Sequence, residues 1–184
     1  MPIMCNELEQ LMKKSILADF YRDFVDDESL TGFVSSFNEE FLCLSIISDT
    51  GTSNGISIVH ISDITRIAWE GNERKSLKRL FDSKQTVLDK LDIKNTLTIK
   101  DIIESVYKKF GHINVLTEGI RSGMAFIGEV IEIDESFILF EGIGTFATLD
   151  TNKLLIRHSE ITRIDAGGTY EKDVAWLSNN VTSQ

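Results

Sequence analysis

The chain contains few of the residues that cross-link, anchor or export a protein. Its 184 residues include two cysteines, Cys5 and Cys43, whose unrelated contexts make no disulfide framework. No segment approaches the roughly 18 uninterrupted apolar residues of a membrane-spanning helix. The first ten residues carry two glutamates and no basic residue, whereas an export signal needs a basic start. We therefore expect a cytoplasmic protein with no membrane association.

The sequence is equally poor in catalytic and metal-binding patterns. His60 and Asp63 are too few ligands for a metal site, and the turn at residues 142–144 lacks the third glycine and the following helix of a dinucleotide loop. None of the three histidines belongs to a local nucleophile motif: His60, His112 and His158. We predict a protein that is not an enzyme and holds no metal or cofactor. An active site assembled from residues far apart in the sequence is the enzymatic alternative left open.

Acidic residues outnumber basic ones, and the balance varies along the chain. The net charge is -10. Residues 1–71 hold 4 basic and 12 acidic residues, residues 98–184 hold 8 and 13, and residues 72–97 hold 7 and 4. An acidic surface repels a phosphate backbone at long range. We therefore expect no DNA binding, and only the middle segment could form a basic surface.

The most informative pattern is an internal repeat. The hexapeptide SDITRI at residues 62–67 returns as SEITRI at residues 159–164. Upstream, Gly32 and Asn38 return 96 residues later as Gly128 and Asp134, and a phenylalanine follows the second residue of each pair at the third position. This spacing predicts a duplicated module.

Each copy is predicted to be one short helix followed by about five short strands. Capping-box patterns begin helices at Asn6, with Glu9, and at Thr98, with Asp101. After each helix the apolar residues alternate with polar ones or form short runs between polar turns, which is typical of antiparallel strands. Because five short strands are too few for an open sheet that covers both of its faces, we expect each copy to close into a small barrel.

Two further segments complete the predicted organisation. Apolar residues at three- and four-residue steps over residues 72–92 predict an amphipathic helix that joins the copies, and one more turn of helix is expected over residues 170–177. The predicted fold class is α+β, mainly β, with two tandem five-stranded antiparallel barrels, each preceded by a short helix. The predicted domains are two barrels, a helical connector and a C-terminal tail: residues 5–71, 98–167, 72–97 and 168–184.

This order of elements resembles the Sm-like family of small barrels. The family's first signature joins a glycine, apolar positions and an Asp, and it is similar to residues 126–137 and, with Asn in place of Asp, to residues 30–41. The second signature, Ile-Arg-Gly followed by apolar positions, looks like residues 156–164 and more loosely like residues 59–67. An SH3-like barrel of another family also fits this pattern.

The copies depart from the family at the positions that contact a nucleotide. The family's Asn after the first signature is replaced by Leu42 and Ile138, and the Gly of the second signature by Ile61 and His158. What the resemblance still implies is a contact with RNA or another ligand at five residues: Asn38, His60, Asp134, Arg157 and His158.

The repeated Arg66 and Arg163 allow two interpretations. Each could contact RNA or a partner, or each could pair with a neighbouring carboxylate such as Asp63 or Glu160. The second interpretation is favoured, because most charged side chains serve structure or simply face solvent.

Sm-like proteins assemble by pairing the edge strands of neighbouring barrels, so the resemblance implies a homo-oligomer or a protein partner. We predict a non-enzymatic assembly or regulatory binding module. An Sm-like protein that contacts single-stranded RNA is the alternative.

Overall fold

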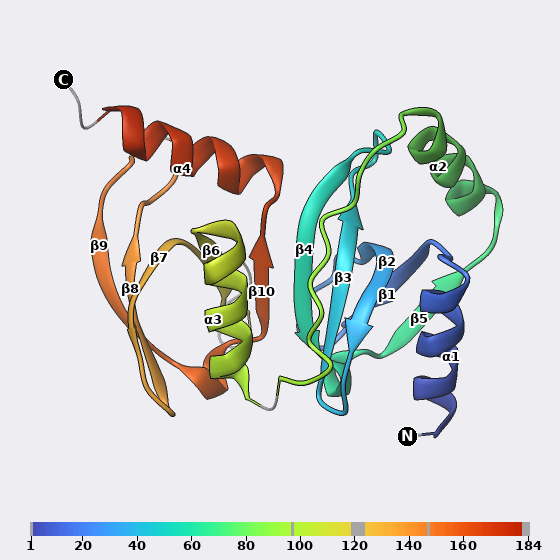
Figure 1. Ribbon diagram of the computed structural model, residues 1–184, viewed down its shortest axis with the longest axis horizontal. Helices are drawn as coiled ribbons and strands as arrows, with labels where there is room; N and C mark the ends of the chain where they lie inside the picture. Colours follow the sequence, from blue (N-terminus) through green and yellow to red (C-terminus); the bar gives the residue numbers. More distant parts are fainter. Residues whose placement is uncertain (1, 97, 119–123, 147, 182–184) are drawn as a thin grey trace. The chain divides into compact units, whose positions relative to one another are not determined.

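The computed structural model describes residues 2–96, 98–118, 124–146 and 148–181, and the chain divides into two compact units, Met1–Asn95 (unit 1) and Thr96–Gln184 (unit 2). The described residues form four α-helices and ten strands in antiparallel ladders (Figure 1). The predicted class, α+β and mainly β, is confirmed. None of the helices in the described part is long and apolar enough to cross a membrane.

Unit 1 is a helix, five strands and a second helix. Its elements are α1 (Pro2–Lys13), β1 (Ala18–Tyr21), β2 (Leu30–Phe37), β3 (Phe41–Ile47), β4 (Ser53–His60), the 3₁₀ turn η1 (Ile61–Asp63), β5 (Arg66–Trp69) and α2 (Asn72–Ser83). The strands pair in the order β5-β1-β2-β3-β4.

Unit 2 repeats this plan element by element. Its elements are α3 (Ile99–Phe110), β6 (Ile113–Leu116), β7 (Ala125–Ile133), β8 (Phe137–Gly142), β9 (Asn152–Arg157), η2 (His158–Glu160), β10 (Arg163–Ala166) and α4 (Thr169–Val181). The strands pair in the order β10-β6-β7-β8-β9. Strand number and strand order are therefore the same in the two halves.

The second strand of each unit bends at equivalent positions. A Cβ added to Gly32 would overlap the carbonyl oxygen of Ser45, and one added to Gly128 would overlap that of Glu141. The ladder register also shifts between Val34 and Ser36 in β2 and between Val130 and Glu132 in β7. A missing side chain and a bulge allow a strand to curve tightly against its neighbour.

Each unit buries one face of this curved sheet against its first helix. In unit 1 the inner face presents Leu42, Leu44 and Val59 to Leu8 and Leu11 of α1. In unit 2 the equivalent positions are also buried apolar residues: Ile138, Phe140 and Ile156 on the strands, with Ile103 and Val106 on α3. The capping box of Thr98 and Asp101 begins α3 as predicted. The first helix, in contrast, begins at Pro2, so that Asn6 lies inside it.

The second helices differ from the prediction in length and in role. The helix expected over residues 72–92 ends at Ser83, because Gln85 adopts a left-handed backbone (φ 51°). The turn expected over residues 170–177 is a full helix over residues 169–181. Each packs on its own unit: Leu77 of α2 lies in a cluster with Ile47, and Val174 of α4 lies in a cluster with Ile143. The repeated module therefore includes a helix at both ends.

Candidate functional site

Asn38 is one of the residues of unit 1 for which the resemblance implies a ligand contact. Asn38 lies in the β2–β3 turn, where its Oδ1 accepts hydrogen bonds from the backbone N–H groups of Glu40 (2.9 Å) and Phe41 (2.7 Å). Its Nδ2 donates to the carbonyl oxygen of Ile93 (3.2 Å). All polar atoms of this side chain thus hold the fold of unit 1 in place.

Asp134 does the same in unit 2. Its Oδ1 accepts from the backbone N–H groups of Ser136 (2.7 Å) and Phe137 (2.8 Å) in the β7–β8 turn. These two donors hold the pKa of the Asp134 carboxyl below its usual value. An Asn or Asp at this position is explained by the turn alone, because its side chain imitates a backbone turn.

His60 and Arg157 occupy equivalent ends of the fourth strand of each unit, opposite a phenylalanine. The ring of His60 lies 4.6 Å from that of Phe41, and the guanidinium of Arg157 lies 4.5 Å from the ring centre of Phe137. The structure therefore brings Asn38 near His60, and Asp134 near Arg157, at the same corner of each unit. Arg157 is exposed and rests on an aromatic face, an arrangement that can stack on a planar group.

His158 is not part of that exposed corner. Its side chain is buried in the position that Ile61 holds in unit 1, and its Nε2 has no hydrogen-bond partner. Burial lowers the pKa of His158, and the nearby Asp134 carboxylate offsets this only in part. The structure thus separates His158 from Arg157 and assigns it to the interior.

The corner is acidic in both units. In unit 1, Glu40 lies 3.7 Å from Nδ1 of His60, and Glu39 is exposed beside it. In unit 2, Glu135 pairs with Lys100 (2.9 Å) and Glu160 is exposed on η2. Such a surface attracts cations and repels phosphate groups.

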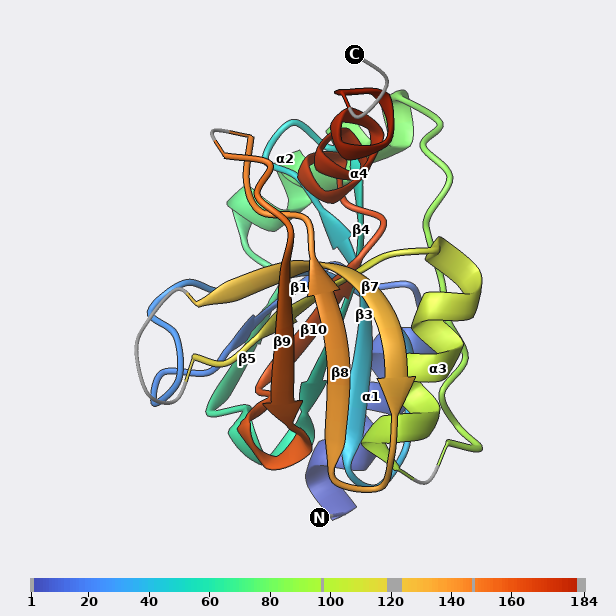
Figure 2. The same ribbon diagram turned by 90° about the vertical axis from the view of Figure 1, so that its left-hand side faces the viewer.

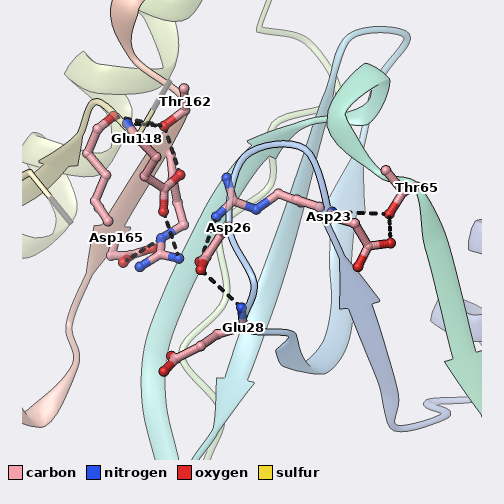
Figure 3. A network of polar contacts seen from close by, with 10 residues as sticks. Asp23, Asp26, Glu28, Thr65, Glu118, Thr162 and Asp165 are labelled. Carbon is pink, nitrogen blue, oxygen red and sulfur yellow. Dashed lines mark hydrogen bonds and ion pairs between the residues drawn. The ribbon is translucent and has the colours of Figure 1, made fainter. Parts of the chain in front are cut away.

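The repeated Thr-Arg pair holds the chain that follows the first strand. Thr65 Oγ1 accepts from the backbone N–H of Asp23 (3.2 Å) and donates to that residue's carboxylate (2.6 Å), while Arg66 donates to the same carboxylate (3.2 Å). In unit 2, Thr162 Oγ1 accepts from the N–H of Glu118 (3.1 Å) and donates to its carboxylate (2.8 Å) (Figure 3).

The repeated arginines take part in the same contacts and therefore have a structural role. Arg163 lies 3.3 Å from the carboxylate of Glu118, as Arg66 lies near Asp23. Arg66 pairs with Asp23, and Arg163 pairs with Glu118 and with its neighbour Asp165 (3.1 Å). The arginines therefore pair with carboxylates, as favoured from the sequence, but these partners differ from the two acids named there, Asp63 and Glu160. The strand pairing accounts for the partner in unit 1, because it places Tyr21 at the end of β1 opposite Arg66 at the start of β5.

A second contact recurs in both units. It joins a side chain of the first strand to a side chain of the second helix, and the residue types differ between the units. In unit 1, Asp19 of β1 forms an ion pair with Arg74 of α2. In unit 2, Asn114 of β6 donates from Nδ2 to the carboxylate of Glu171 on α4 (3.2 Å). The two helices bind the same strand positions through different side chains, which supports a shared origin of the modules.

Hollows lie beside the second helix in both units, and their linings differ. In unit 1 a pocket of about 360 Å³ lies between the α1–β1 turn and four cations of α2. Two of these cations are already paired, Arg74 with Asp19 and Lys78 with Asp82. The hollow of unit 2, about 190 Å³, is lined by His112, Glu129 and polar residues of α4. Each module therefore has a hollow at this place, but the residues that line it differ between the two.

The largest difference between the units lies on the outer face of the sheet. In unit 1 this face is buried, and residues 86–93, which we call the strap, cross its second and third strands (Figure 1). In unit 2 the same face of β7, β8 and β9 is turned toward the viewer in Figure 2, and none of the other described segments of unit 2 crosses it. Leu155 there is 66% exposed, whereas its equivalent in unit 1, Ile58, is 2% exposed.

Sequence reasoning missed this surface. The signal was the alternation in β9, where Lys153, Leu155 and Arg157 share one face.

Comparison with family models, with curated proteins and with solved structures finds no match to the chain. Among the described residues, no group of three or more His, Cys, Asp or Glu side chains could hold a metal ion.

Proposed function

We propose that the protein is a non-enzymatic binding module for protein assembly, built from two Sm-like modules. The resemblance is supported by the helix and five strands of each unit, with a close-packed glycine and a bulge in the second strand. In this proposal each unit is a small barrel. Neither Cys5 nor Cys43 forms a disulfide, which fits a protein of the reducing cytoplasm.

The observation that carries the assembly function is the contrast between the outer faces. In unit 1, seven residues on this face are at most 4% exposed: Phe33, Ser36, Phe41, Cys43, Ser45, Ile56 and Ile58. In unit 2, Leu155 and Ile131 are 66% and 45% exposed on the equivalent face. Neighbouring exposed apolar side chains rimmed by charges mark interaction sites.

The test is the molecular mass in solution. Light scattering of the purified chain should give a mass well above 20.8 kDa, or the chain should form a defined complex with a partner protein. The exposed Leu155 should be required in either case, because a glutamate there puts a charge into the contact. A strict monomer that forms no complex dependent on Leu155 contradicts the proposal.

RNA binding is the second candidate function, and Arg157 favours it. A guanidinium stacked on Phe137 at an exposed corner offers a planar cation to a base. The acidic corner opposes this function. If RNA is the ligand, a labelled U-rich or A-rich oligomer should bind with an affinity that falls as salt rises, and Arg157→Ala should weaken it. Absence of binding at low salt removes this candidate.

A further inference from the structure

The strap shows how a sheet face of this module takes up an extended chain. Alternate strap residues turn both of their backbone polar groups to the sheet. Ser45 Oγ donates to the carbonyl oxygen of Asp89 (2.6 Å), and Ser36 Oγ donates to that of Leu91 (2.7 Å) and accepts from the N–H of Ile93 (3.0 Å). Because these bonds go to the backbone, they place little demand on the sequence of the bound segment.

Apolar contacts complete the seat of the strap. Ile93 is fully buried, and Leu88 packs on a cluster that includes Phe33 and Ile47. Between Leu88 and Ile93 the charged residues Asp89, Lys90 and Asp92 stand on either side of Leu91. The occupant of this face is therefore an extended segment of mixed charge with two or three aliphatic residues.

The equivalent face of unit 2 has the same outline with different polar groups. Ladder register makes Leu139 and Leu155 neighbours at its centre. The serines that hold the strap are replaced by carboxylates, Ser36 by Glu132 and Ser45 by Glu141. On β9 the same face carries Lys153 and Arg157. Leu139 and Leu155 thus lie opposite each other, with Glu132 of β7 beside Leu139 and the pair of Glu141 and Lys153 two residues along the β8–β9 ladder.

We propose that this face binds, in trans, an extended peptide segment of a partner protein that carries the strap's pattern of aliphatic residues interspersed with charges of both signs. The carboxylates of Glu132 and Glu141 lie where Ser36 and Ser45 lie in unit 1, but a carboxylate only accepts hydrogen bonds, so it cannot donate to carbonyl oxygens as the serines do. In unit 2 these carboxylates accept from backbone N–H groups and from lysines of the segment. Lys153 and Arg157 face its acidic residues. Leu139 and Leu155 take the aliphatic side chains out of water.

This inference rests on the proposed assembly function and names its partner class. It differs from the family's edge-strand pairing, because the segment lies on the face of the sheet and is held by side chains. Unit 1 is the intramolecular counterpart, in which the chain supplies its own segment.

The probe is a synthetic peptide of residues 85–95, added to the full chain and followed by fluorescence anisotropy. We expect saturable binding, weakened about tenfold or more by Leu155→Glu, because one buried leucine accounts for about that factor. Trp176→Glu is the matched control: Trp176 is 64% exposed, similar to Leu155, but it lies on α4. This variant should bind as the parent chain does.

Nuclear magnetic resonance locates the peptide independently of the variants. Amide signals of residues 137–142 and 152–157 should shift, while those of residues 41–47 and 53–60 should not. A peptide of the same composition with its aliphatic residues grouped at one end should bind more weakly. Equal binding of both peptides, or shifts confined to unit 1, overturns the proposal.

The same variants separate this inference from the function on which it rests. If the strap peptide does not bind but the chain associates with itself through Leu155, the face is an interface between copies and the peptide proposal is wrong while the assembly function stands. If neither peptide binding nor association depends on Leu155, both proposals are wrong.

Discussion

At the scale of single residues, the interiors of the two modules differ at the start of the 3₁₀ turn. Unit 1 buries Ile61 at the start of its 3₁₀ turn, and unit 2 buries His158 there with an unpartnered Nε2. An unpaired buried polar atom costs about 1–3 kcal/mol. The resemblance implied a ligand contact at His158. The structure buries this side chain, and its unpaired Nε2 lowers the stability of unit 2.

His158→Ile should stabilise unit 2, and more so at acid pH. Burial makes the pKa of His158 lower in the folded than in the unfolded state. Below about pH 6.5 the unfolded chain therefore binds more protons than the folded chain, and the stability decreases as the pH is lowered. We expect the variant to gain about 1 kcal/mol in the free energy of unfolding at pH 8 and more at pH 5. Urea unfolding at both pH values measures this.

The pH slope of the variant should be smaller than that of the parent without vanishing. Burial also lowers the pKa of His112, so that residue keeps part of the acid sensitivity. Identical slopes in the parent and in His158→Ile would show that the His158 side chain is solvated in the folded protein.

At the scale of elements, the glycine of the second strand was predictable and the end of the second helix was not. Gly32 and Gly128 recur at the repeat spacing, and both lie where a side chain would overlap a carbonyl oxygen of the next strand. The apolar spacing of residues 72–92 suits a helix, but Leu88 belongs to the strap that follows it. No glycine or proline marks the break near Gln85, so local sequence carried no stop signal.

Gly128→Ala should destabilise unit 2 by about 3 kcal/mol, because the added Cβ overlaps backbone that has nowhere to move. Gly111→Ala is the comparison, since a Cβ there meets no atom within 4 Å and the cost comes from its left-handed backbone alone, φ 75°. We expect the Gly111 variant to lose only about 1 kcal/mol. Thermal unfolding of the two variants ranks them, and an equal loss would contradict the close approach.

At the scale of the whole molecule, each unit has its own strand order and its own buried core. Unit 1 is complete only with the strap, which satisfies serine hydroxyls on its outer face and buries Ile93. The end of the domain is thus set by the strap and lies at about residue 95.

A fragment of residues 1–95 should therefore fold by itself, and a fragment of residues 1–84 should not fold stably. We expect the shorter fragment to lose about 3 kcal/mol or more, because Ile93 returns to water and several hydroxyls lose their partners. Circular dichroism during heating compares the two fragments. A shorter fragment with the same melting transition would mean that the strap adds nothing to unit 1.

The sequence by itself determined the duplication, the succession of helix and five strands, and the turn and glycine positions, because these depend on periodicity and on backbone geometry within a few residues. Only the tertiary structure decided which carboxylates the repeated threonines hold, that His158 points inward, and where the strap lies. Those outcomes join residues tens of positions apart, as Thr65 and Asp23 do. The exposed face of unit 2 follows in the same way, since Leu155 and Ile58 are both aliphatic and differ only in what covers them.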